Sequence, residues 1–258
     1  MRSLLILIPA LLGTLAQAGQ IQMEQRLSTT LENGRLRLYV TAHNLGPDST
    51  LKVQPIVWFL GRPHPLPTLE RLEPDTFYQQ RLDLPLPEPG AYGLLVDLRY
   101  RSPRAGYSLP AFIANPDYRP PQQLELRWLP PADPPRLQIH NHSGQPLTVT
   151  LTVLAPWELG LEPPPRQITL AAGERRTLKT PLRYLEVAGH QSTAVIHALA
   201  DFSTPQGHRI AYAALNLHAA PWLATLPWGS IAVVLALTLG IALLWGLGHK
   251  KPPADKTG

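Results

Sequence analysis

The chain of 258 residues contains no cysteine. Its absence excludes a disulfide scaffold, a thiolate zinc site, an iron–sulfur cluster and a cysteine nucleophile. Charged residues are scarce too, at 16%, against about 25% in ordinary soluble domains. Proline is abundant, with 30 residues, and argues against a helical bundle because it breaks helix interiors. Hydrophobic residues make up 44%, which is enough to build a core, so the chain is not disordered overall.

Signatures of enzyme sites are also missing. The sequence has no G-x-S-x-G nucleophile turn, no H-E-x-x-H zinc motif, no phosphate-binding P-loop and no glycine-rich dinucleotide motif after a strand. We therefore expect a protein that is not an enzyme, with no catalytic residues and no cofactor.

The amino-terminal residues have the pattern of a secretory signal peptide. Arg2 supplies a positive charge, Leu4–Leu12 forms an apolar run, and residues 16–18 fit the A-x-A cleavage site. We expect residues 1–18 to be removed, so that the mature chain begins at Gly19.

A second apolar run, from Ala219 to Gly248, contains no charged residue. A helix over its last 21 residues would span about 31 Å, the thickness of a bilayer core. Lys250 and Lys251 follow at once, and lysines beside a span mark its cytoplasmic side. The expected parts are a stalk over 221–227, a transmembrane helix over 228–248 and a cytoplasmic tail over 249–258.

One face of the expected membrane helix carries small residues. Ala232, Ala236 and Gly240 lie four residues apart, and such faces let helices pack closely in lipid. These three residues are candidates for helix packing within the membrane.

The exported part carries little net charge. Four of the 23 basic and one of the 18 acidic residues lie in the terminal segments, which leaves +2 of the formal +5. We therefore expect no nucleic-acid partner. An exported chain without cysteine favours a bacterial source. The expected location is the bacterial inner membrane, with the domains in the periplasm.

Between the terminal segments the hydrophobic pattern has period two. Leu124–Trp128 and Leu147–Val153 alternate, and pairs such as Asn-Gly and Pro-Gly separate the runs. The pattern predicts an all-β fold. Pro55, within the expected strand Leu51–Leu60, predicts an edge position or a bulge.

The β segment consists of two copies of one unit. His43-Asn44 precedes one strand and His140-Asn141 precedes its counterpart, and three further landmarks follow in the same order, 97 to 101 residues apart. Two tandem immunoglobulin-like β-sandwich domains of about seven strands each are expected. Their bounds are 19–115 and 122–220, with a Pro-rich linker over 116–121 that acts as a stiff spacer.

The second unit has an asparagine turn at Asn141, Trp157 after its second strand, and an aliphatic run that ends in Gly173-Glu174. This pattern resembles bacterial extracytoplasmic immunoglobulin-like modules of the NEW3 and CARDB kind. The first unit departs from it at residues 73–75, where Glu-Pro-Asp replaces Gly-Glu. The resemblance covers both units, and implies β-sandwiches used in cell-envelope proteins for spacing, adhesion or subunit contacts. It implies no catalytic residues.

His140 and His142 are the one pair with metal-ligand spacing. Residues two apart in a strand point to one face, so both imidazoles could bind copper or zinc. A useful site needs a third ligand, and His43, the repeat equivalent of His140, lies in the other domain. The preferred interpretation is therefore two polar side chains that flank Asn141 at a strand end.

Aromatic side chains leave a glycan site open. Sugar stacking needs several of them exposed on one sheet face, whereas sandwiches bury about one tryptophan in each core. Packing in the core or loops is the preferred role. The residues concerned are Trp58, Trp128, Trp157, Tyr78, Tyr92, Tyr100 and Tyr107.

Three functions remain open. The preferred one is a non-enzymatic, single-span cell-envelope protein whose two domains contact protein partners, as an accessory or scaffold subunit of a membrane complex. The alternatives are a carbohydrate-binding or adhesion module, and a metal-handling assembly factor for a respiratory or other envelope enzyme.

Overall fold

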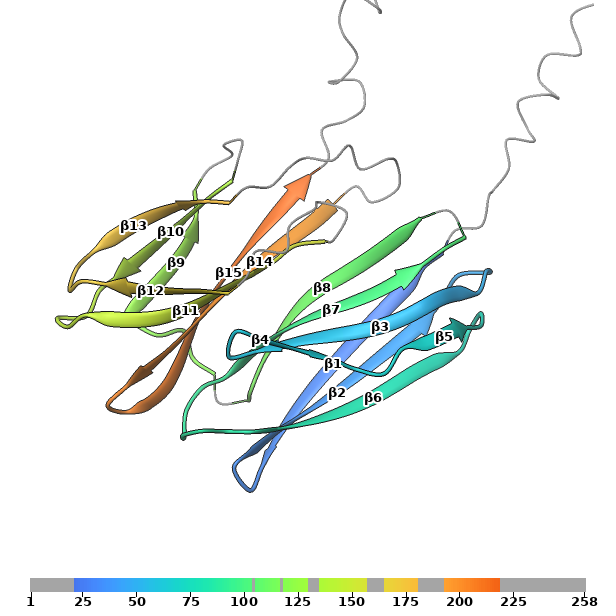
Figure 1. The fold of residues 1–258 in the computed structure, drawn as a ribbon, viewed down its shortest axis with the longest axis horizontal. Helices are drawn as coiled ribbons and strands as arrows, with labels where there is room; N and C mark the ends of the chain where they lie inside the picture. The colour runs from blue at the N-terminus through green and yellow to red at the C-terminus, as the bar shows by residue number, and fades with distance from the viewer. Residues whose placement is uncertain are drawn as a thin grey trace, which may run out of the picture. The chain divides into compact units, whose positions relative to one another are not determined.

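The computed structural model describes residues 21–103, 105–116, 118–129, 135–156, 165–180 and 193–218. These residues form strands and turns, which confirms the all-β prediction (Figure 1). The chain divides into two compact units, Met1–Leu217 and His218–Gly258, and the sheets belong to the first. The expected signal peptide, stalk, membrane helix and tail lie outside the described residues. Within the part that the structure describes, no helical segment has the length and hydropathy that a membrane crossing requires.

The amino-terminal half of the described chain forms two antiparallel sheets. One has the order β1–β2–β6, and the other has the order β4–β3–β7–β8, with β5 also paired to β3. The strands are β1 (Met23–Glu32), β2 (Arg35–Asn44), β3 (Thr50–Phe59), β4 (Arg62–Pro65), β5 (Leu69–Leu72), β6 (Phe77–Pro85), β7 (Gly93–Arg101) and β8 (Gly106–Ala114).

The carboxyl-terminal half forms a second pair of sheets, with the orders β9–β10–β13 and β12–β11–β14–β15. The strands are β9 (Leu124–Trp128), β10 (Arg136–Asn141), β11 (Leu147–Leu154), β12 (Arg166–Leu170), β13 (Arg175–Lys179), β14 (Thr193–Thr204) and β15 (Gly207–His218).

The two halves have the same topology. With β4 left aside, the first, second and fifth strands of each half form the smaller sheet, and the remaining four form the larger one. β4 is the one addition, and it extends β3 of the first half as a short hairpin. The repeat that was inferred from turn residues is therefore a repeat of strand pairing.

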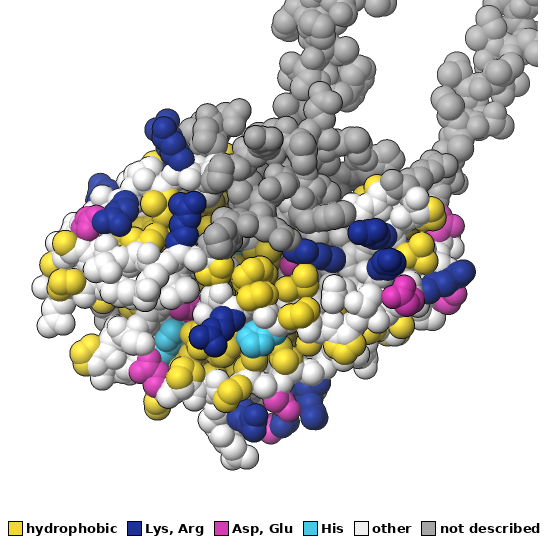
Figure 2. Space-filling model, viewed as in Figure 1, with side chains coloured by type: hydrophobic (Ala, Val, Ile, Leu, Met, Phe, Trp, Pro, Cys, Tyr) yellow, Lys and Arg dark blue, Asp and Glu magenta, His cyan; other side chains and the backbone are white. Residues whose placement is uncertain are grey.

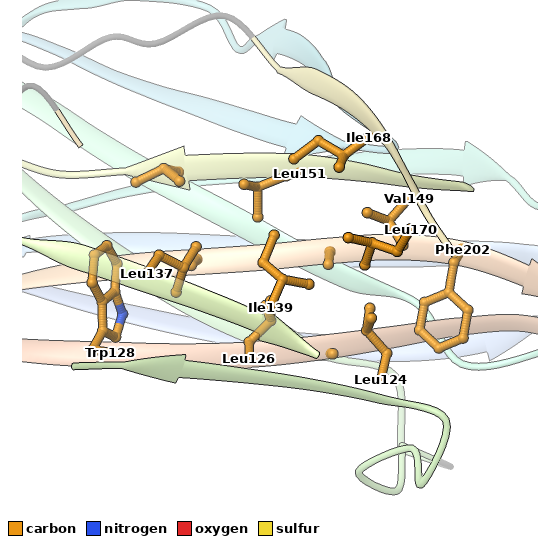
Figure 3. Packing of buried hydrophobic residues seen from close by; sticks show 14 of the residues in the cluster. Leu124, Leu126, Trp128, Leu137, Ile139, Val149, Leu151, Ile168, Leu170 and Phe202 are labelled. Atoms are coloured by element: carbon orange, nitrogen blue, oxygen red, sulfur yellow. The ribbon is translucent and has the colours of Figure 1, made fainter. Parts of the chain in front are cut away.

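Each half encloses its own apolar core. Alternation places Leu124, Leu126 and Trp128 of β9 on the buried face, opposite residues of β11 and β12 such as Val149 and Leu170 (Figure 3). The core of the first half is built in the same way from its own two sheets. Burial of these side chains is the main force that holds each pair of sheets together.

Pro55 lies in an internal strand, because β3 is paired on both sides, by β7 and by β4 and β5. The edge position expected from the sequence is wrong. The expected bulge is confirmed, since the register with β7 shifts between Leu51 and Gln54, and Lys52 has a φ of 50°. Pro55 itself follows the bulge and pairs in regular register with Leu98 of β7.

The two halves pack on one another through an apolar cluster, which we call the junction. Its buried members are Ala91, Leu95, Leu154, Leu199 and Ile210, and they come from both halves. Backbone hydrogen bonds reinforce it, because Ala91 N–H donates to the carbonyl of His208 (2.9 Å) and His208 N–H donates to that of Pro89 (3.0 Å).

Part of the expected linker belongs to the junction as well. Tyr118 packs edge-on against Phe112 of β8, with 6.1 Å between ring centroids, and Phe112 stacks on Tyr212 of β15 at 3.8 Å. This part of residues 116–121 is therefore attached to the folded halves. Asp117 lies outside the described residues.

Candidate functional site

Three potential metal ligands meet on the outer face of the β9–β10–β13 sheet. Glu125 of β9 and His140 of β10 are register partners, and both alternate with buried neighbours, so both point outward. His142 follows two residues after His140. One ligand atom from each of the three lies within 4.8 Å of the other two.

The three side chains of the cluster are close to one another. Nε2 of His142 lies 3.1 Å from Oε2 of Glu125, and the two imidazole rings have centroids 3.8 Å apart with planes at 50°. His142 is exposed over 41% of its side chain. The cluster is thus accessible from solvent.

A cation borders the cluster. Arg175 of β13 is the other register partner of His140, and its Nη2 lies 3.5 Å from His140 Nδ1. Desolvation, together with the charges of His142 and Arg175, lowers the pKa of His140, while Glu125 acts in the opposite direction. These effects favour the neutral imidazole, which is the form that binds metals.

The sheet around the cluster is basic. Arg127, Arg136 and Lys179 lie exposed on the same three strands, and Figure 2 shows Lys and Arg side chains gathered in the region of β10 and β13. Glu125 adds a negative charge to this cationic face.

Two members of the cluster were predicted from the sequence, and the third was not. The spacing of His140 and His142 predicted that both lie on one face, which the structure shows. The third ligand considered was His43. The outward position of Glu125 follows from the alternation of Leu124–Trp128. The pairing of Glu125 with His140 depends on the register of β9 and β10, which no local pattern reveals.

The first half carries the equivalent positions with different chemistry. Glu24 pairs with His43 as Glu125 pairs with His140, and Phe77 occupies the position of Arg175. Phe77 stacks on the His43 ring at 4.0 Å, and Nε2 of His43 lies 3.1 Å from Oδ1 of Asp75. Leu45 stands where the second half has His142. His43 is therefore part of a separate polar contact.

A second polar cluster lies at the junction. Nε2 of His208 lies 3.2 Å from Oδ1 of Asp201, and its ring stacks on Tyr92 at 4.2 Å. Asp201 is buried, and this burial raises its pKa although His208 opposes the shift. Asp201 and His208 line a cavity of about 310 Å³. The hydroxyl of Ser203 donates to the carboxylate of Glu88, which adds a polar contact between the halves.

The tyrosines considered for glycan stacking lie mostly in the interior. Tyr78, Tyr92 and Tyr100 are buried, and Tyr107 is partly buried and stacks on Tyr100. Their expected packing role is confirmed, as it is for Trp128 in the core of the second half.

The remaining residues named from the sequence fall in two groups. Trp58 packs against the junction. Trp157 and the proposed helix-packing residues Ala232, Ala236 and Gly240 lie outside the described residues.

No protein-family model and no curated protein matches the chain. Among solved structures 65 chains match, and one of them is a red sea bream transglutaminase with 13% identity and a TM-score of 0.27. The match covers 76% of this chain and 31% of the transglutaminase, so the chain spans less than a third of that protein's length. This likeness is too low to assign a family.

Proposed function

We propose that the chain is a non-enzymatic, single-span cell-envelope protein. Its two immunoglobulin-like domains bind protein partners, as an accessory or scaffold subunit of a membrane complex. The observation that carries the proposal is the junction, which joins two copies of one sheet pair through a buried apolar cluster and backbone hydrogen bonds. A pair of domains held in this way pays little conformational entropy when a partner contacts both.

The strand order supports an immunoglobulin-like identity for each half. A sheet of the first, second and fifth strands faces a sheet of the other four, as in Greek-key sandwiches. In constant-type domains the fourth strand pairs with the fifth. Here the fourth strand pairs with the third, because β5 pairs with β3 and β12 pairs with β11. In both halves the fourth strand has therefore moved from the smaller sheet to the larger one, relative to a constant-type domain.

The envelope location rests on the terminal segments of the sequence. The signal-like residues 1–18 would send the chain across the membrane, and the uncharged run ahead of Lys250 would hold it there with the domains outside.

Protease protection of membranes from the native cell tests this arrangement. In spheroplasts, added protease should degrade residues 19–220, while alkaline carbonate should leave the chain in the membrane pellet. Release by carbonate, or protection of the domains without permeabilisation, would contradict the single-span topology. A chain that ends before the span should be soluble, and full replacement of the native protein by this chain would show that anchoring is not part of the function.

The adhesion alternative now depends on two other aromatic residues. Tyr39 and Phe77 point outward from the β1–β2–β6 sheet with 38% and 54% exposure. Binding in a glycan screen that is lost on Phe77→Ala would favour a carbohydrate module, whereas a blank screen would leave protein contact as the function.

A further inference from the structure

The Glu125–His140–His142 cluster has the composition of a transition-metal site. Two borderline imidazole ligands with one carboxylate suit Zn²⁺ and Cu²⁺, whereas Ca²⁺ and Mg²⁺ prefer oxygen ligands alone. Three protein ligands also leave a coordination position open for water or for a group from another molecule.

The backbone around the two histidines is fixed from both sides. The N–H of Asn141 donates to the carbonyl of Glu174 (2.9 Å), and the N–H of His142 donates to that of Gln123 (2.8 Å). The side chain of Asn141 then holds the following turn by accepting from the N–H of Ser143 (2.9 Å). His142 is thus positioned beside Glu125 although it lies beyond the end of β10, so binding a metal requires little rearrangement of the backbone.

We propose that Glu125, His140 and His142 bind one divalent transition-metal ion, and that Cu²⁺ binds more tightly than Zn²⁺. The preference follows the general order of affinities for sites of this ligand type. This inference is independent of the proposed protein-binding function, because it concerns the outer face of one sheet and not the junction.

The duplicated unit provides an internal comparison. The first half has the same Glu–His pair in Glu24 and His43, but Leu45 replaces the second histidine and Phe77 covers the ring of the first. The half with His142 therefore has three ligands that are mutually close, whereas the described residues of the other half hold no such group. The titration should accordingly give one equivalent of metal per chain.

Arg175 opposes the metal. Its guanidinium cannot act as a ligand in its charged form, and it lies 3.5 Å from His140 Nδ1, where it repels a cation and competes for the ring nitrogen. Replacement of Arg175 should therefore strengthen binding, while replacement of any ligand should weaken it. These opposite signs distinguish a defined site from general attraction of metal to surface histidines.

The test is calorimetric titration of the full chain with Cu²⁺ and Zn²⁺, after purification without a polyhistidine tag and removal of metal by a chelator. We expect one equivalent of Cu²⁺ and weaker binding of Zn²⁺. His142→Ala and Glu125→Gln should weaken Cu²⁺ binding by about tenfold or more, since even the hydrogen-bond partners of metal ligands contribute 10–100-fold. Arg175→Gln should bind several-fold more tightly.

His64→Ala is the matched control, because His64 lies on β4 of the other half and outside the cluster. Its affinity and stoichiometry should equal those of the wild type. Equal Cu²⁺ binding by wild type and His142→Ala would overturn the proposal, as would no binding by the wild type. Far-ultraviolet circular dichroism confirms that each variant is folded.

Discussion

Asn44 and Asn141 hold the same turn in the two halves, and neither side chain is exposed to solvent. The amide of Asn141 donates to the carbonyls of Gln145 (2.9 Å) and Ala171 (2.8 Å). The amide of Asn44 donates in the same way to the carbonyl of Asp48 (2.8 Å), four residues further along the chain. Each asparagine thus connects its own turn to a distant segment of the same half, Asn44 to Leu72 and Asn141 to Ala171.

Asn141→Ala should therefore destabilise the second half. The replacement removes one donor from each of the Gln145 and Ala171 carbonyls and the acceptor of the Ser143 N–H, and we expect this to cost about 1–3 kcal/mol. Urea unfolding measures this cost. Gln138→Ala, on the outer face of the same strand, is the control and should change stability by less than about 0.5 kcal/mol. Equal effects of the two substitutions would contradict the structural role of the asparagine.

His197 of β14 is a buried histidine with a defined tautomer. Its Nε2 lies 3.2 Å from the carbonyl oxygen of Pro110, which can only accept, so Nε2 carries the proton. Nδ1 then accepts from the hydroxyl of Tyr212 (2.8 Å). Burial lowers the pKa of His197, although the Pro110 carbonyl acts in the opposite direction. The folded chain thus favours the neutral ring.

This burial predicts a loss of stability in acid. Below a pH of about 6.5 the unfolded chain binds a proton at this histidine more readily than the folded chain does. Stability should therefore fall as the pH drops from this value through the lowered pKa. His197→Gln retains a donor for Pro110 and cannot titrate, so it should lose less stability between about pH 7.5 and about pH 5.

Urea unfolding of both proteins at the two pH values measures this difference. Asp201 titrates in wild type and variant alike. The difference between the two proteins in how much the free energy of unfolding changes with pH therefore isolates His197. An identical change in both proteins would show that His197 does not carry the pH dependence.

At the scale of elements, the segment that leads into β7 brings the two halves together. Gly90 has a φ of 151° and forms a bridge with His208, and a Cβ there would lie 2.2 Å from the His208 carbonyl oxygen. The contact is between backbones, so it cannot adjust by a change of rotamer. Glycine is therefore required at this position.

Gly90→Ala should weaken the junction. Both the backbone conformation and the space are unfavourable, and we expect a loss of about 2 kcal/mol or more in the free energy of unfolding. Gly144→Ala is the matched control, since nothing lies within 4 Å of its Cβ position and its φ is not positive. The prediction fails if the two variants unfold at the same urea concentration.

At the scale of the whole molecule, two cores and one junction form a single compact unit. The outer faces of this unit differ in chemistry, with a basic face and the Glu125–His140–His142 cluster on β9–β10–β13 and exposed aromatic residues on β1–β2–β6. The duplication has thus kept the topology and the asparagine turns while the exposed positions changed. Such divergence is suited to a module that presents different contacts on a common scaffold.

Much of this architecture was predictable from local patterns. Alternation identified β9 with its observed bounds and β11 to within one residue, and the turn residues revealed the duplication. The junction was not predicted, although its signal is present in the apolar run Gly93–Val96, which is buried throughout and not alternately. A continuous apolar run indicates a strand that is covered on both faces. What covers it, like the pairing of Glu125 with His140, depends on long-range contacts that the sequence does not display.

The most direct test of the proposed function is a crosslinked pull-down of the full-length chain from its native membrane, analysed by mass spectrometry. The account predicts a stoichiometric set of membrane proteins that is recovered with the wild type and reduced with Gly90→Ala, because the partner contacts both halves. Recovery of the chain alone, or of cell-wall glycan, would contradict it.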